Sequence, residues 1–217
     1  MIDSLHRLDT EIFLFFNGLN HDIVDPFMAT VSGRWIWVPM YLAIAACVVW
    51  RYGWKRGVIV IAAACVAVGV ADFVCASVIR PVIGRLRPAN IENPISYMVH
   101  VVNDYRGGRF GFPSCHAANT FALAVFTALQ FRVRRYSVFI FVWTALLCYS
   151  RIYLGVHYPG DILAGAVVGS AAATALYFSI RRFVGKEEDR HATLRPVYIT
   201  AGVTVLYVFA EMAVRSL

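Results

Sequence analysis

Long apolar segments separated by short charged connections dominate the hydropathy pattern of the chain. An α-helix needs about 20 apolar residues to cross a hydrocarbon core about 30 Å thick. Six segments approach or reach this length, at residues 35–50, 57–79, 117–131, 136–154, 162–180 and 197–214. The pattern therefore predicts an all-α, polytopic bundle of six transmembrane helices, formed by one integral-membrane domain over residues 1–217.

The N-terminus has a different pattern. Apolar residues recur at helical spacing among charged ones: Leu5, Leu8, Ile12, Phe15 and Phe16 against Asp3, Arg7, Asp9 and Glu11. This arrangement predicts an amphipathic helix that lies in the membrane interface rather than spanning it. A simple lead-in to the first apolar segment explains the same pattern equally well.

Composition and charge support a membrane protein. The chain is 59% hydrophobic and 15% charged, against about 45–50% and about 25% in soluble proteins. The formal net charge of +7 could suggest nucleic acid, but more than half of the 20 Lys and Arg lie in three connections, at 51–56, 132–135 and 181–195. These connections share one side of the membrane, which the positive-inside rule makes cytoplasmic. We therefore expect no nucleic-acid partner, and we place the loops 80–116 and 155–160 on the outer side.

The five cysteines give no sign of a metal site. Four lie in apolar segments, where a cysteine behaves as a small hydrophobe, and no CxxC pair occurs. Only Cys115 lies in a predicted outer loop. We predict neither a zinc site nor a disulfide framework.

Three polar clusters lie at the predicted outer ends of the spans. RPVIGRLRP follows the second span, GFPSCHAANT precedes the third, and SRIYLGVHYPGD joins the fourth to the fifth. Taken alone, each has a simpler explanation: interfacial anchoring for an arginine such as Arg85, helix capping for Ser114 or Asp161, and a structural role for a histidine. Because all three clusters share one membrane face, helix packing can bring them together.

Together the clusters indicate a phosphate site. Arg80, Arg87 and Arg151 would repel one another unless an anion lay between them, and guanidinium groups bind phosphate oxygens through paired hydrogen bonds. The helix that starts at Ser114 would present unpaired N–H groups to the same anion.

Two histidines are candidates for the chemistry. His157 and Asp161 are four residues apart, so a helix would place them on one face. An aspartate that accepts a hydrogen bond from one ring nitrogen leaves the other nitrogen as a nucleophile or base. His116 precedes a short span, which places it near headgroup depth.

These residues resemble the type 2 phosphatidic acid phosphatase superfamily, whose motifs are KxxxxxxRP, PSGH and SRxxxxxHxxxD. The motifs occur in family order at residues 80–88, 113–116 and 150–161, and the resemblance spans about residues 72–169. Arg80 replaces the lysine, and Cys115 replaces the glycine. We expect both departures to affect selectivity rather than reaction class.

The resemblance implies a role for each matching residue. His157 would attack phosphorus to form a phosphohistidine, oriented by Asp161, and His116 would protonate the leaving oxygen and then activate water. The phosphate oxygens would be held by Arg80, Arg87, Ser114 and Arg151. The resemblance implies no metal and no other cofactor.

The implied function is an integral-membrane phosphatase of a bacterial envelope lipid: undecaprenyl pyrophosphate, phosphatidylglycerol phosphate or lipid A. The expected location is the bacterial inner membrane, with the active site on the periplasmic or outer face. The expected partners are the lipid substrate and the bilayer, without an obligatory protein partner. The sequence does not select one lipid, and we expect the loop 89–112 to read the headgroup.

Other functions stay open at this point. The same intermediate would serve a phosphotransferase, and the motifs could persist in a non-catalytic lipid-binding or transport protein. His116 and His157 could also ligate haem, although haem ligation does not require neighbouring arginines. Asp72, an acid within the second apolar segment, is explained only by pairing with a polar group on another helix.

Overall fold

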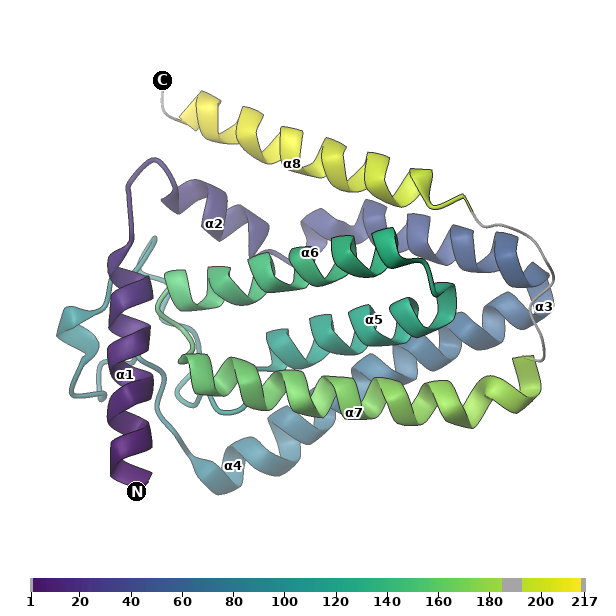
Figure 1. The fold of residues 1–217 in the computed structure, drawn as a ribbon. Coiled ribbons are helices and arrows are strands. Elements are labelled where there is room, and N and C mark those ends of the chain that lie inside the picture. Colours follow the sequence, from purple (N-terminus) through teal and green to yellow (C-terminus); the bar gives the residue numbers. More distant parts are fainter. Residues whose placement is uncertain (1, 185–192, 216–217) are drawn as a thin grey trace.

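The computed structural model describes residues 2–184 and 193–215, and this part of the chain is helical. The α-helices are α1 (Ile2–Gly18), α2 (Asp25–Val31), α3 (Val38–Phe73), α4 (Arg80–Ile83), α5 (Cys115–Phe131), α6 (Arg134–Tyr153), α7 (Pro159–Val184) and α8 (Arg195–Arg215) (Figure 1). Short 3₁₀ turns form at Trp35–Trp37 and Ser96–Met98, and a π-helical turn at Val74–Ile79. No strand forms in the described ranges, where Leu86 and Phe110 make an isolated bridge, so the all-α class is confirmed.

Helix α3 folds back on itself at Gly53, where φ is 72° and ψ is 166°. Only glycine adopts a positive φ at little cost. The two arms approach closely beyond the bend, because a Cβ on Gly57 would lie 2.9 Å from the Cα of Val49. The two arms make up most of the first two predicted segments, 35–50 and 57–79, which also include the turns at Trp35–Trp37 and Val74–Ile79 (Figure 1).

Three stretches of the described chain are long and apolar enough to cross a bilayer: Trp35–Ile83, Arg134–Tyr153 and Pro159–Val184. The first holds both arms of α3. Helix α5 has 17 residues, or roughly 26 Å at 1.5 Å per residue, and is short as predicted. Large apolar side chains point outward from α3, α7 and α8, including Val66, Leu163 and Leu206, as expected for surfaces that face lipid.

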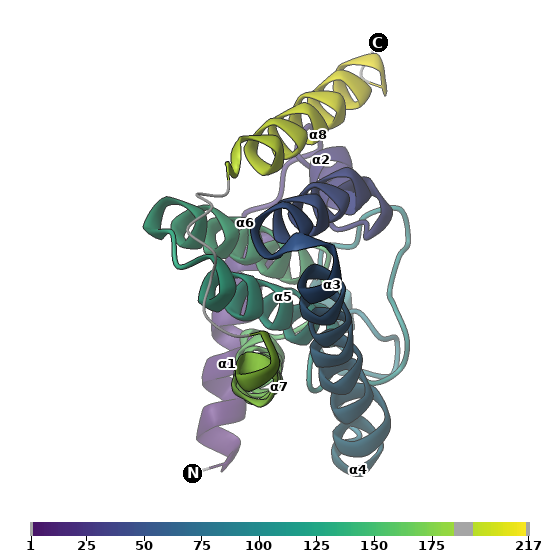
Figure 2. The same ribbon diagram turned by 90° about the vertical axis from the view of Figure 1, so that its right-hand side faces the viewer.

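Helix α5 lies against α3, α6 and α7 (Figures 1 and 2). Glycines bring α7 close to it: a Cβ on Gly165 would lie 2.3 Å from the Ser114 carbonyl oxygen, and one on Gly169 would lie 2.1 Å from that of Ala118. Small residues allow helix backbones to approach this closely. The start of α5 is thereby held beside the first turns of α7, and both carry predicted site residues.

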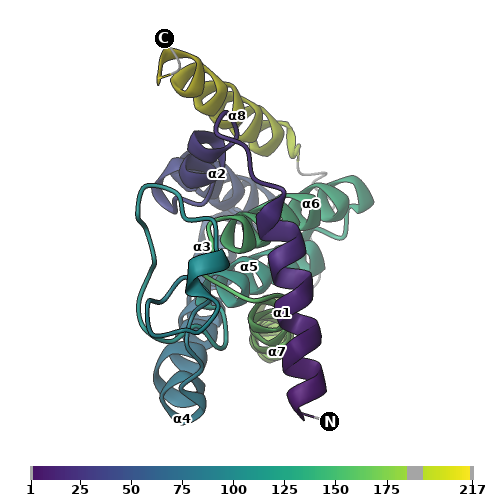
Figure 3. The same ribbon diagram turned by 90° about the vertical axis from the view of Figure 1, so that its left-hand side faces the viewer.

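The predicted N-terminal helix is present as α1, which runs across the ends of α6 and α7 (Figures 1 and 3). Its predicted apolar stripe faces away from the protein, with Leu5 61% and Phe15 64% exposed. The face that packs on the bundle carries Asp9, Phe13 and Asn17 instead, and the last two are buried. An outward apolar stripe suits a helix that rests on a lipid surface.

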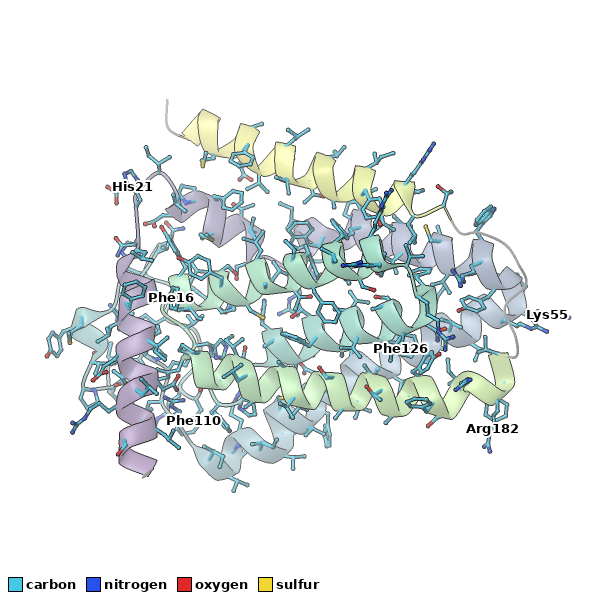
Figure 4. The ribbon with its side chains drawn as sticks, viewed as in Figure 1. Phe16, His21, Lys55, Phe110, Phe126 and Arg182 are labelled. Atoms are coloured by element: carbon cyan, nitrogen blue, oxygen red, sulfur yellow. The ribbon has the colours of Figure 1, made fainter. Side chains whose placement is uncertain are left out.

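The two ends of the bundle carry different connections. Lys55 and Arg182 lie at one end, whereas Phe16, His21 and Phe110 lie at the other (Figure 4). The described parts of the predicted basic connections therefore lie at the end of the bundle opposite the motif loops. Lys186 and Arg190, from the third basic connection, lie outside the described residues.

We expect the close contact between α5 and α7 to be sensitive to one methyl group. Gly165→Ala must displace the Ser114 carbonyl, and overpacking of this kind costs about 1–3 kcal/mol. Gly202→Ala is the matched control, because nothing lies within 4 Å of its added Cβ in α8. Thermal unfolding in detergent should show a lower midpoint for Gly165→Ala and an equal or higher one for Gly202→Ala. Equal midpoints would mean that the helices are further apart than described.

Candidate active site

The three motif loops meet at the end of the bundle that α1 crosses. The Ser114 N–H donates to the Asp161 carbonyl oxygen at 3.0 Å, which joins the start of α5 to the start of α7. Arg87 donates from Nη1 to the Val156 carbonyl at 2.9 Å, which joins the loop after α4 to the α6–α7 connection. Ser114 also caps α5, since its Oγ accepts from the Ala117 N–H at 3.3 Å. These two contacts, one between backbone groups and one from a side chain, thus bring the three sequence clusters into one site.

His157 is buried in this site, and its two ring nitrogens have different partners. Nδ1 lies 3.4 Å from Asp161 Oδ2, and Nε2 lies 2.9 Å from Arg87 Nη1. Because a guanidinium group only donates, Nε2 is the acceptor and Nδ1 carries the proton. Burial, and then the charge of Arg87, lowers the pKa of His157 well below its usual value. The ring is therefore neutral at pH 7, with the Nε2 lone pair available for chemistry.

Asp161 is fully buried and held from several sides. Oδ2 accepts from the Tyr158 N–H at 3.0 Å in addition to facing His157. Oδ1 accepts from Arg85 Nη1 at 3.0 Å, and Arg85 Nη2 lies 2.7 Å from Asp9 Oδ2 of α1. Interfacial anchoring, which explained Arg85 at the sequence level, does not describe this residue. Asp9 was not predicted at the site, because its spacing on α1 indicated only a polar face.

Arg80, Arg87 and Arg151 gather around the same space. Burial, followed by the charges of Arg80 and Arg151, lowers the pKa of Arg87 to about 10. In the described part of the chain, the Nε atoms of all three arginines are buried and have no hydrogen-bond partner. Three converging cations with unused donors favour an anion such as phosphate.

The two departures from the family motifs contact each other. Arg80 Nη2 donates to the Pro113 carbonyl at 2.8 Å and to Cys115 Sγ at 2.9 Å. A planar guanidinium group can reach both acceptors from one nitrogen while its other donors stay free. The arginine and the cysteine therefore form one local arrangement at the start of α5.

The connection before α3 adds residues that sequence reasoning missed. Arg151 Nη1 donates to Ser32 Oγ, and His116 Nε2 lies 3.2 Å from the Ser32 carbonyl oxygen. Burial, and then the charge of Arg151, lowers the pKa of His116 to about 4, and Arg34 adds to the effect. The available signal was the polar triplet SGR at residues 32–34, directly before the first apolar segment.

A polar cavity of about 210 Å³ lies beside His116 and includes Ser32, Arg34 and Asp72 in its lining. Asn119 of α5 donates from Nδ2 to Asp72 Oδ1 at 2.9 Å, so Asp72 pairs across helices as the sequence allowed. A second cavity of about 500 Å³ shares Tyr41, Asn119 and Thr120 with the first. Apolar side chains from both arms of α3 and from α5 make most of its wall.

Charged residues of the loop 89–112, which was predicted to read the headgroup, make contacts that fix the position of the loop. Arg109 pairs with Glu92 at 2.8 Å, and His100 pairs with Asp25 of α2 at 3.0 Å. Arg106 donates to the Ala89 carbonyl at 2.9 Å. These residues hold the loop over the site, and the exposed Arg109–Glu92 pair lies on its outer surface.

Protein donors already engage the acidic side chain next to His157. Among the residues that the structure describes, no group of three or more His, Cys, Asp or Glu side chains could hold a metal. Asp161, the acid next to His157, already accepts hydrogen bonds from Arg85 and the Tyr158 N–H.

Sequence comparison places these motifs in a known family. The PAP2 superfamily matches residues 56–184, a range that contains all three motifs. The lipid A 4'-phosphatase of Bacteroides thetaiotaomicron is 45% identical over 86% of this chain and 83% of that protein. The lipid A 4'-phosphatase of Porphyromonas gingivalis is 35% identical over 81% of this chain and 74% of that protein.

Two crystal structures share the fold. Aquifex aeolicus LpxE superposes with a TM-score of 0.61 at 20% identity, covering 78% of this chain and 94% of that chain. A PAP2-type phosphatidylglycerolphosphate phosphatase from Bacillus subtilis gives the same score and identity, covering 83% and 89%. The resemblance predicted from the three motifs is confirmed: the chain belongs to the PAP2 superfamily of membrane lipid phosphatases.

Proposed function

We propose that this lipid phosphatase removes the 4′-phosphate of lipid A or of a closely similar envelope lipid. The observation that carries the proposal is the convergence of Arg80, Arg87 and Arg151 on a neutral His157, an arrangement suited to a phosphate dianion. Identity to two lipid A 4'-phosphatases over most of their length favours this lipid. An undecaprenyl-diphosphatase of Sulfolobus acidocaldarius is less similar, at 28% identity over 66% of this chain.

In the proposed reaction, His157 Nε2 attacks phosphorus while the bond from phosphorus to the lipid oxygen breaks. Arg87 Nη1, which donates to Nε2 in the structure, would move to a phosphate oxygen, joining Arg80, Arg151 and Ser114 in stabilising the developing charge. His116 would protonate the leaving lipid oxygen. It would then take a proton from the water that attacks the phosphohistidine and releases inorganic phosphate.

The proposed membrane arrangement uses six crossings: the two arms of α3, then α5, α6, α7 and α8. It is supported by the separation of Lys55 and Arg182 from the motif loops along the bundle (Figure 4) and by the positive-inside rule. The site would then face the periplasmic or outer side of the inner membrane, and the apolar stripe of α1 would rest in that interface.

The apolar cavity is the proposed site for an acyl chain. It adjoins the polar cavity beside His116, so a lipid with its phosphate at headgroup depth could place a chain between α3 and α5. Its volume of about 500 Å³ falls in the range of ligand pockets, about 300–1,000 Å³.

Phosphate release by the detergent-purified protein tests the reaction and the lipid together. Lipid A, undecaprenyl pyrophosphate and phosphatidylglycerol phosphate would be compared with EDTA present, and we expect the fastest release from lipid A. His157→Ala should reduce release by about a thousandfold or more. His21→Ala, at an exposed histidine between α1 and α2, should leave release unchanged. A phosphorylated acceptor in place of free phosphate would instead identify a transferase.

Anion binding should depend on the protonation of His116. Its pKa of about 4 reflects burial and nearby arginines, and a bound dianion would raise it by opposing their charge. Binding would then take up a proton, so affinity should increase as the pH falls from about 8 to about 5. Sulfate is a suitable probe because its charge is constant over this range.

Calorimetric titration with sulfate at several pH values measures the effect. His116→Gln should flatten the dependence, and His21→Gln should retain it. An affinity that is independent of pH in the unmodified protein would contradict proton uptake by His116.

Filling the apolar cavity should slow turnover of long-chain lipids selectively. Ala64 lines the cavity, and Val66 on the same arm of α3 is 50% exposed to the outside. We expect Ala64→Phe to raise the KM for lipid A several-fold while hydrolysis of a short-chain phosphate monoester stays near normal. Val66→Phe should leave both unchanged. Equal effects of the two substitutions on lipid A would argue against a chain in this cavity.

A further inference from the structure

Helix α1 is held on the active site by specific contacts along one face. The rings of Phe13 and Tyr158 pack at 5.3 Å between centroids, and Asn17 Nδ2 donates to the Tyr153 carbonyl at 2.8 Å. Asn17 Oδ1 in turn accepts from the His100 N–H at 2.8 Å. These contacts bind α1 to the α6–α7 connection and to the loop 89–112, so the position of α1 is determined by the site loops.

Asp9 lies on the same face and has two partners at the site. Its Oδ1 accepts from the Gly160 N–H at 2.8 Å, in the first turn of α7. Its Oδ2 lies 2.7 Å from Arg85 Nη2. A Cβ on Gly160 would lie 2.7 Å from Asp9 Oδ2, so the carboxylate is seated directly against the backbone that leads to Asp161.

Arg85 connects this carboxylate to Asp161. Its Nη1 donates to Asp161 Oδ1 at 3.0 Å, and its Cζ lies 3.8 Å from the centroid of the Tyr158 ring. Its own carbonyl accepts from the Gly111 N–H at 2.9 Å, which fixes the backbone of the loop. The guanidinium group therefore lies between two carboxylates and against an aromatic face, with little freedom to move.

We propose that Asp9 is a positioning residue of the active site, which acts through Arg85 on Asp161 and so on His157. The inference rests on the proposed function of His157 as the nucleophile. Asp9 supplies a second negative charge to Arg85, so the guanidinium group is not neutralised by Asp161 alone. More of the Asp161 charge is then left to interact with the imidazole of His157. When His157 bonds to phosphorus its ring becomes positive, and the Asp161 charge that faces Nδ1 stabilises that state.

This role predicts an effect on turnover rather than on substrate binding. Asp9 does not contact the phosphate-binding arginines 80, 87 and 151 in the structure, so KM should change little. Without the Asp9 charge, Arg85 pairs with Asp161 alone, and formation of the phosphohistidine should slow. The N-terminal helix would then belong to the catalytic apparatus as well as to the membrane-facing surface.

The test compares charge-removing substitutions on the two faces of α1 in the full chain. Asp9→Asn keeps an oxygen that can accept from the Gly160 N–H. It removes the negative charge that faces Arg85. Glu11→Gln removes the same charge from an exposed position two residues away. We expect Asp9→Asn to lower kcat about tenfold or more, with KM within about twofold and an unchanged thermal midpoint. Glu11→Gln should match the unmodified protein.

A double-mutant cycle with Arg85→Gln separates positioning from general destabilisation. If Asp9 acts through Arg85, Asp9→Asn should change kcat by less than about twofold once Arg85 is replaced. Independent, multiplying effects would overturn the proposal, as would a normal kcat for Asp9→Asn or an equal loss in Glu11→Gln. These outcomes are distinct from failure of the proposed function, in which the unmodified protein itself would release no phosphate.

Discussion

Mutual repulsion among three clustered arginines, two buried and one half-buried, is the constraint on which the site depends. Arg80, Arg87 and Arg151 converge on His157. Burial first, and then the charges of neighbouring arginines, lowers the pKa of Arg87 and of both histidines. Such an arrangement is stable only if the surrounding chain holds each guanidinium group in place. Here Arg80 donates to the Pro113 carbonyl and Arg87 to the Val156 carbonyl. Arg151 donates to the hydroxyl group of Ser32. A dianion bound among the three guanidinium groups, as proposed for the substrate phosphate, would offset their repulsion.

The helical bundle supplies the rigidity that this constraint requires. Gly165 and Gly169 let α7 approach the backbone of α5, and the Ser114 N–H bonds to the Asp161 carbonyl where the two helices start. The start of α5, which carries His116, is thus held beside the start of α7, which carries Asp161. The close packing of α5 and α7 therefore also fixes the positions of the site residues at the start of these helices.

Helix α1 has one face directed away from the protein and an opposite face packed on the candidate active site. One face presents Leu5, Leu8 and Phe15 outward, and the opposite face presents Asp9 and Asn17 to the site loops. A helix of this kind can rest in the interface while it fixes residues at headgroup depth. The location of the site at the end of the bundle crossed by α1 agrees with a phosphate carried by a lipid.

The sequence by itself determined the helical class, the apolar segments and the residues of the three motifs. Hydropathy and motif spacing are local properties of the chain, so they can be read without knowing which segments pack together. The pairing of His157 with Asp161 was predicted from their short separation along the chain. His157 precedes α7, however, so the α6–α7 connection rather than a helical turn brings the two side chains together.

Only the tertiary structure decided which distant residues complete the site. Asp9 lies far from Arg85 along the chain, as Ser32 does from Arg151, and no local pattern links them. Arg85 had the sequence features of an interfacial anchor, and Asp72 had no visible partner, until packing placed Asp161 beside one and Asn119 beside the other. The physical reason is that a buried charge is defined by what surrounds it, and those surroundings come from segments that meet only when the helices pack.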